Sequence, residues 1–185
     1  IKDRAALFMI KDAEEKKLIE KGQVLIEATG GNTGIGVSLV GNALGYKSII
    51  VMPDTQAQEK KDTVRACGAQ LIEVPAVPYS NPENYIHVAS RLAQKVDGYF
   101  CNQFDNTSNR AGHMKTTGPE IWNALEGKID AFTTAVGTGG TLGGVSMALK
   151  ERSTNILTVA ADPEGSVIHD FIKSGELTTV GDSIT

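Results

Sequence analysis

The chain has 185 residues, of which 41% are hydrophobic and 22% are charged. This length suits one domain or one and a half, with enough apolar side chains for a sizeable core. The net charge of −4 argues against nucleic acid or an anionic membrane as the main partner, and no apolar run approaches the ~20 residues of a membrane-spanning helix. The two cysteines, Cys67 and Cys101, make no disulfide framework and the three histidines are scattered. We therefore expect a reducing compartment and no metal site.

Helix-like and strand-like patterns alternate along the chain from its first residues. Apolar positions at helical spacing predict helices, and short apolar runs bounded by glycine, proline or asparagine predict strands. The expected helices span residues 3–20, 34–45, 56–68, 83–96, 118–125 and 142–152. The expected strands span residues 24–28, 47–52, 70–74, 98–104, 130–136 and 156–161. Apolar strands separated by helices indicate an α/β fold with a mostly parallel sheet, covered by helices on both faces.

The order of the elements indicates two domains that meet where polar residues cluster, at 105–109. We expect residues 1–106 to form a smaller domain and residues 107–185 to form part of a larger one, cut short. The chain begins in a helical pattern without an initiator methionine, and 175–185 contains no clear closing element. We therefore expect a fragment of a longer protein, from which any targeting segment has been lost.

A glycine loop, GTGGT at Gly137–Thr141, lies between a predicted strand and a predicted helix. In open α/β sheets ligands bind at the carboxyl ends of strands, and the N–H groups at a helix start attract anions. The small residues let backbone amides surround a phosphate, and Thr138 and Thr141 add hydroxyl donors. A tight turn without a ligand is the alternative, but five such residues in a row favour a phosphate site.

Neither of the two common phosphate-binding motifs fits this chain. The Walker pattern is absent, and the dinucleotide fingerprint needs a sixth-position glycine where Leu142 stands, or Leu39 when counted from Gly34. Asp162 does follow the next predicted strand, where a ribose-binding acid would lie. A nicotinamide-dependent dehydrogenase therefore remains an alternative.

The first glycine loop, TGGNTG at Thr29–Gly34, carries an amide side chain at Asn32. An amide can both donate and accept hydrogen bonds, so the loop suits a second anion, such as a carboxylate, beside a ring that Asn32 contacts. An ordinary helix N-cap, formed by Asn32 or Thr33, explains the same residues. The loop alone leaves both interpretations open.

Five motifs occur in order along the chain: IKDR, EATGGNTGIG, MPDTQAQEKK, NQFDNTSNRAGHMKTTGPEI and AVGTGGTLGG. Together they resemble the β-family of pyridoxal-phosphate-dependent enzymes, which has the tryptophan-synthase-like fold (fold type II). The chain looks most similar to cysteine synthase (O-acetylserine sulfhydrylase), with cystathionine β-synthase near it. The resemblance covers essentially the whole chain. It implies a three-layer αβα fold and pyridoxal 5′-phosphate as the cofactor.

The resemblance also implies roles for individual residues. Lys2 of IKDR matches the lysine that holds the cofactor as a Schiff base and serves as catalytic base, and a lysine at a helix start is favoured in its neutral form. Asn32 matches the asparagine that contacts the cofactor's ring hydroxyl. The positions matching the phosphate-binding loop are Gly137, Thr138, Gly139, Gly140 and Thr141. The positions matching the substrate-binding residues are Thr29, Gly30, Thr33 and Gln103.

This chain departs from the family pattern at three places. Gly30 stands where the family often has serine, Ala57 replaces the serine of MPxxxSxE, and Ile1 precedes Lys2. These departures affect the choice of substrate more than the cofactor. We expect His113, in the stretch that ends in TTGPEI, to be a structural residue. The group that faces the pyridine nitrogen lies further toward the C-terminus than this chain extends.

The activity implied by the resemblance is replacement of the β-substituent of O-acetylserine or serine by sulfide, which makes L-cysteine. A homocysteine-using cystathionine β-synthase and a serine or threonine dehydratase are alternatives within the family. A nicotinamide-dependent dehydrogenase and a non-catalytic relative are alternatives outside it. The family is usually dimeric, so we expect a homodimer. We expect a cytoplasmic location, or a mitochondrial or plastid one if a transit peptide precedes the chain.

Overall fold

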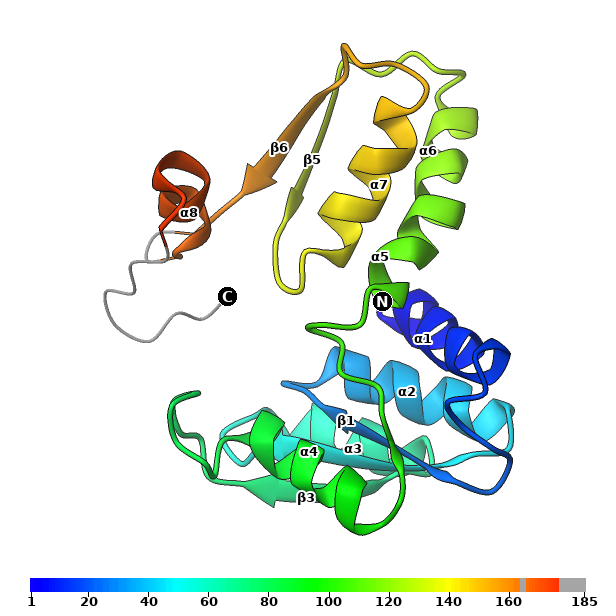
Figure 1. Cartoon of the computed structure of the whole chain (residues 1–185), viewed down its shortest axis with the longest axis vertical. Helices are drawn as coiled ribbons and strands as arrows, with labels where there is room; N and C mark the ends of the chain where they lie inside the picture. Colours follow the sequence, from blue (N-terminus) through cyan, green and yellow to red (C-terminus); the bar gives the residue numbers. More distant parts are fainter. Residues whose placement is uncertain (164–165, 177–185) are drawn as a thin grey trace. The chain divides into compact units, whose positions relative to one another are not determined.

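The computed structural model describes residues 1–163 and 166–176 (Figure 1). The described residues form two compact units, one up to Asn109 and one from Arg110 onward. The expected lack of a closing element at 175–185 falls, from residue 177 onward, outside the described residues. None of the described helices is both long and apolar enough to cross a membrane.

The first unit is built around a parallel sheet with the strand order β3-β2-β1-β4. Its strands are β1 (Val24–Ala28), β2 (Lys47–Pro53), β3 (Gln70–Val74) and β4 (Tyr99–Phe100). Its helices are α1 (Asp3–Glu15), α2 (Asn32–Ala43), α3 (Gln58–Ala66) and α4 (Tyr85–Lys95), and α5 (Ser108–Gly112) begins at its end. A parallel sheet with helical crossovers confirms the predicted fold class for this unit.

Helices cover both faces of this sheet, because alternate residues of each apolar strand point to opposite sides. One core contains Leu25 of β1 and Ile50 of β2, packed against Met9 of α1 and Val37 of α2. The opposite core contains Ile26 and Ala28 of β1, Val51 of β2, and Ala89 and Ala93 of α4. The three layers of this unit are therefore those expected from the sequence.

The second unit pairs β5 (Ala131–Ala135) with β6 (Leu157–Ala161) in parallel. Its helical elements are the π-helix η1 (His113–Thr117), α6 (Gly118–Ala124), α7 (Gly140–Lys150) and α8 (Ile168–Ser174). The core lies between the strand pair and helices α6 and α7. Alternate strand residues, among them Leu157 and Val159, are exposed. In the described part of this unit the sheet is thus covered on one face, where two covered faces were expected.

Several element boundaries differ from the predicted ones. Helix α1 ends at Glu15, before the expected residue 20, and β4 is only two residues long. Helices α2 and α7 begin two residues earlier than expected, at Asn32 and Gly140, so part of each glycine loop belongs to the first turn of the helix that follows it. Neither η1 nor α8 was predicted, and the expected strand 98–104 continues beyond Phe100 as a loop.

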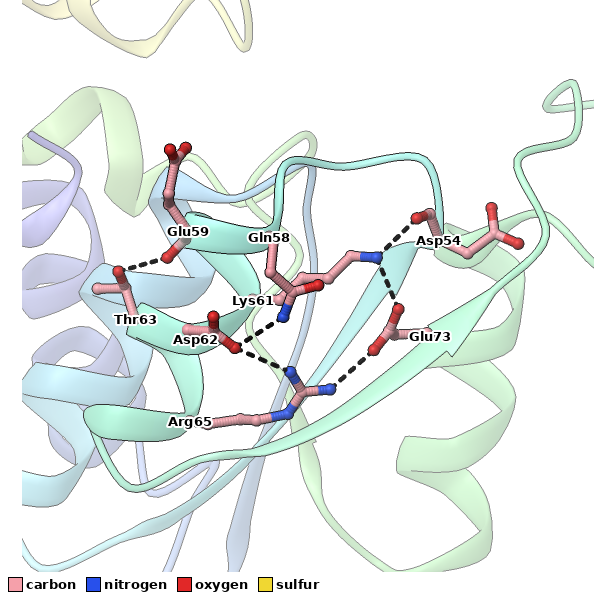
Figure 2. A network of polar contacts seen from close by, with 8 residues as sticks. All are labelled: Asp54, Gln58, Glu59, Lys61, Asp62, Thr63, Arg65 and Glu73. Carbon is pink, nitrogen blue, oxygen red and sulfur yellow. Dashed lines mark hydrogen bonds and ion pairs between the residues drawn. The ribbon is translucent and has the colours of Figure 1, made fainter.

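An ion-pair network ties α3 to the strands beside it (Figure 2). The ammonium of Lys61 lies 2.7 Å from a carboxylate oxygen of Glu73 on β3 and donates to the carbonyl of Asp54 at 2.6 Å. Arg65 contacts the other oxygen of Glu73 at 2.7 Å. Both contacts lower the pKa of Glu73. Because a buried ammonium needs polar partners, this network accounts for the burial of Lys61.

Candidate functional site

Lys2 directly precedes α1 and is half-buried. Burial lowers the pKa of its amine, and the carboxyl of Glu27 opposes that effect. Helix α2 holds the lysine backbone closely, since a Cβ added to Gly36 would lie 3.0 Å from the carbonyl carbon and oxygen of Lys2. A partly desolvated amine fixed in this way is suited to act as a nucleophile and as a base.

The first glycine loop enters α2 without a side-chain cap. The N-cap is Gly31, whose φ of 146° favours glycine and which makes no side-chain cap hydrogen bond to α2. The proposed caps, Asn32 and Thr33, therefore do not fill that role. Asn32 is exposed at the first position of α2, so the helix start presents N–H groups and an amide where an anion can bind.

Three of the predicted substrate-binding residues are buried at this end of β1. Thr33 Oγ1 donates to Gln103 Oε1 at 2.5 Å, and Gln103 Nε2 donates to the carbonyl of Ala28 at 2.9 Å. Thr29 Oγ1 accepts from the Gly31 N–H at 2.9 Å. A hydroxyl that accepts still has its hydrogen to donate, and the amide of Gln103 has a second one. The chemistry of Thr29 and Gln103 therefore allows each to bind a carboxylate oxygen.

Gly30, the fourth predicted substrate-binding position, lies against α3 and the turn before it. Lys60 Nζ donates to the Gly30 carbonyl at 3.3 Å and to Gln56 Oε1 at 3.2 Å. The amide of Gln56 would lie 3.7 Å from a Cβ added at Gly30. An ammonium and an amide thus lie beside the loop where the family often has a serine. Sequence reasoning missed both, although they fall in the quoted MPDTQAQEKK motif.

The second glycine loop joins β5 to α7 in the other unit. Its N-cap is Gly139, with a left-handed φ of 77°, and the Gly140 N–H donates to Thr138 Oγ1 at 3.4 Å. A Cβ added at Gly137 or Gly139 would meet nothing within 4 Å. The space beside these two α-carbons is therefore open, which leaves room for an anion to approach the loop backbone.

His113 contacts the start of α7 from the π-helix. Its ring nitrogens lie 2.9 Å from Thr117 Oγ1 and 3.3 Å from Thr141 Oγ1. A Cβ on Gly144 would lie 2.3 Å from the carbonyl oxygen of Arg110 in α5 and 2.9 Å from the backbone nitrogen of Met114 in η1, so α7 packs closely on the backbone of both segments. The residue expected to be structural therefore borders one residue of the predicted phosphate loop. π-Helices often occur at functional sites.

Glu27 is a third residue near the candidate site that sequence reasoning did not single out. It is fully buried in β1, and burial raises its pKa to about 8. A signal was present, because an acidic residue interrupts the apolar run VLIEA. Among the described residues, no group of three or more histidine, cysteine, aspartate or glutamate side chains could hold a metal ion.

Comparison with known families gives one match over nearly the whole chain. The family described as pyridoxal-phosphate dependent enzyme matches residues 1–183. This match overturns the alternative of a nicotinamide-dependent dehydrogenase. Asp162, the residue considered for ribose binding, accepts a hydrogen bond from the His169 N–H at 3.1 Å. The family match and the relatives' names confirm the predicted family and its cofactor.

The chain is similar to two kinds of curated relative. It is 52% identical over 177 residues to cysteine synthase 1 of Emericella nidulans, with 95% of this chain and 48% of that protein covered. It is 43% identical over 170 residues to cystathionine beta-synthase of Apis mellifera, with 91% and 34% covered. The chain thus spans about half the length, or less, of the curated relatives it matches.

A solved structure of O-ureido-L-serine synthase is similar in fold, with a TM-score of 0.85 and 36% identity. The similarity covers 96% of this chain and 55% of that one. The predicted fold, of the type found in these pyridoxal-phosphate enzymes, is confirmed.

The residues present fit pyridoxal phosphate in each unit taken separately. The uncrowded backbone at Gly137 and Gly139 leaves room for a phosphate group. The partly desolvated amine of Lys2 is suited to react with an aldehyde. Lys2 and Asn32 belong to one unit and residues 137–141 to the other. That both segments hold one cofactor stays a prediction, as do the individual roles of all these residues.

Proposed function

Because the chain belongs to the family of pyridoxal-phosphate-dependent enzymes, we propose that the whole protein replaces the acetate of O-acetylserine by sulfide. The products are L-cysteine and acetate. The observation that carries this proposal is the half-buried, pKa-lowered amine of Lys2, in a chain 52% identical over 95% of its length to a protein named cysteine synthase 1.

When bound, pyridoxal phosphate supplies the electron sink that acidifies the α-proton of an amino acid and lets its β-substituent leave. Lys2 Nζ is the atom that takes the α-proton, because its neutral form is favoured by burial. Thr29 and Gln103 orient the substrate through its carboxylate, and Thr33 holds the Gln103 amide in place. Asn32 binds the cofactor ring, and the amides of Gly137–Thr141 bind its phosphate.

The nucleophile and the leaving group are the finer part of the proposal. Homocysteine remains the competing nucleophile, because the chain is also 43% identical to cystathionine beta-synthase of Apis mellifera. Gly30 lacks the hydroxyl of the serine that the family often has at this position. Polar groups of Gln56 and Lys60 lie beside Gly30 instead. We propose sulfide because the chain is more similar to the cysteine synthase of Emericella nidulans than to this cystathionine beta-synthase.

We also propose that the whole protein is a homodimer, which light scattering tests. We propose a cytoplasmic or organellar location, which imaging tests.

The test uses the full-length protein. We expect it to be yellow, with an absorbance band that borohydride removes and that Lys2→Ala shifts. With O-acetylserine and sulfide it should form cysteine, and with homocysteine much less cystathionine. A colourless protein sinks the proposal. Cystathionine as the main product would assign the cystathionine β-synthase reaction instead. A yellow protein inert to both nucleophiles would indicate a different substrate or a non-catalytic relative.

A further inference from the structure

Glu27 is an acidic residue within the buried and otherwise apolar strand β1. Strand register places it beside Ile50 of β2. On the other side the Cys101 N–H donates to the Ile26 carbonyl at 2.9 Å, which continues the β1–β4 pairing past Phe100. Leu25, two residues earlier, faces the core beneath α1 and α2. Because side chains alternate along a strand, Glu27 faces that same core.

Burial disfavours the anionic form of the Glu27 carboxyl more strongly than its neighbours stabilise it. Its exposed fraction is 0%, and neither carboxyl oxygen has a hydrogen-bond partner among the described residues. Burial raises its pKa to about 8, although polar groups of Gln103 and Ala28 lie near enough to counter part of that effect. Glu27 is therefore predominantly a neutral acid at neutral pH.

Lys2 is the cation that acts on Glu27. The attraction between them lowers the pKa of Glu27 and raises that of Lys2, in each case against a larger effect of burial. Helix α2 covers the face of the sheet to which Glu27 points, and it holds the backbone of Lys2 at that face because Gly36 packs on it. Two ionisable groups held near each other in a partly dry site titrate as a pair.

The two tyrosines and the cysteine near Glu27 do not change charge near pH 8. Burial raises the pKa of Tyr99 to about 12, and raises those of Tyr85 and Cys101 as well. Helix α2, which covers this face, carries no charged residue. On α1, Asp12 acts electrostatically on Tyr99 and accepts from Ser108 Oγ at 2.8 Å.

We propose that Glu27 is a positioning residue that controls the charge of the Lys2 amine. As a neutral acid it leaves the amine without a counter-ion, which favours the unprotonated form needed for attack and for proton abstraction. As a carboxylate it draws a proton onto Lys2 and makes it a poorer base. This inference rests on the proposed role of Lys2, and it assigns Glu27 no contact with substrate or cofactor.

The first test measures the protonation of Glu27 directly, by infrared difference spectroscopy of the holoenzyme and its Glu27→Gln variant. We expect wild type at mildly acidic pH to show the carbonyl stretch of a buried carboxylic acid. That band should be missing from Glu27→Gln and should disappear as the pH rises through about 8. An ionised Glu27 throughout this range overturns the inference. If Glu27→Gln fails to fold, carbon-13-labelled glutamate in wild type identifies the same band.

The second test follows Lys2 in cofactor-free protein whose lysines are dimethylated with carbon-13, the Lys2 signal being identified by its absence from Lys2→Arg. In Glu27→Gln the amine should titrate about one pH unit lower than in wild type. Glu73→Gln, which disturbs the Lys61 network on β3, should leave Lys2 unchanged. An unchanged Lys2 titration in Glu27→Gln overturns the inference. Neither readout needs turnover, so an inactive protein would sink the proposed function and leave this test standing.

Discussion

Thr33 and Gln103, which lie 70 residues apart in the chain, form a hydrogen bond of 2.5 Å between two buried side chains. The bond joins the first turn of α2 to the loop after β4. Through Gln103 Nε2 it also reaches the carbonyl of Ala28, at the end of β1. The three segments of the first unit that carry predicted substrate-binding residues are thus held together by one amide.

Replacing Thr33 by valine removes the donor and keeps the shape. We expect Thr33→Val to lower the free energy of unfolding by about 1–3 kcal/mol, because the buried oxygen of Gln103 loses its partner. It should also weaken binding of the amino-acid substrate, since the Gln103 amide is then held only by its bond to the Ala28 carbonyl. Urea unfolding and substrate titration measure the two effects. Thr33→Ser keeps the hydroxyl and should be close to wild type. Equal losses in both variants would contradict the role of the hydrogen bond.

Substitutions at two glycines of the second unit should have different effects, one on stability and the other on cofactor binding. In Gly144→Ala the new Cβ would lie 2.3 Å from the Arg110 carbonyl oxygen and 2.7 Å from His113 Cβ. We expect the free energy of unfolding of this variant to fall by about 1–3 kcal/mol, because the added methyl group overpacks the core. In Gly137→Ala the Cβ meets nothing within 4 Å, so stability should change little while affinity for pyridoxal phosphate falls, because a methyl group narrows the approach to the amides.

Thermal unfolding and cofactor titration of these two variants provide the measurement. Each glycine serves as the control for the other, since both receive the same methyl group. Unchanged cofactor affinity in Gly137→Ala would contradict the phosphate role of Gly137–Thr141. Unchanged stability in Gly144→Ala would contradict the close packing of α7 on η1.

Glu14, near the end of α1, makes part of the stability depend on pH. It accepts from Lys11 at 2.8 Å, and from Lys21 and the Tyr46 hydroxyl at 2.9 Å each. Hydrogen bonds from Lys11, Lys21 and Tyr46 lower its pKa to about 2. The folded state therefore binds fewer protons than the unfolded state between the ordinary value of 4.5 and about 2. The stabilisation is complete above that interval and is lost as the pH falls through it.

We expect Glu14→Gln to be less stable than wild type at neutral pH, by about 0.5–1 kcal/mol because the cluster borders solvent. The difference should shrink on acidification below pH 4.5. Urea unfolding at neutral and at acidic pH measures it. Glu15→Gln, an exposed neighbour on the same helix, is the matched control. A difference that grows on acidification would reverse the assigned sign.

Much of this protein could be read from local pattern. The runs at 24–28 and 70–74 became strands with the expected bounds. The first is buried inside the sheet, where a covered parallel strand is mostly apolar on both faces, and the second is the partly exposed edge strand. The two glycine loops were placed correctly between strand and helix, and the five ordered motifs identified the family. These features depend on residues close together in the chain, so the sequence carries them directly.

Tertiary structure decided what depends on distant partners. Nothing in the local sequence HMKTT predicts the π-helix η1. Its close contact with Gly144 of α7 joins residues about 30 positions apart in the chain, which local pattern does not reveal. Glu27 appeared only as an acidic residue within an apolar strand. Its burial between Ile50 and the segment after β4, and its coupling to Lys2, follow from sheet register and helix packing. Desolvation is a property of the whole fold, so the chemistry of a buried acid cannot be read from its neighbours in sequence.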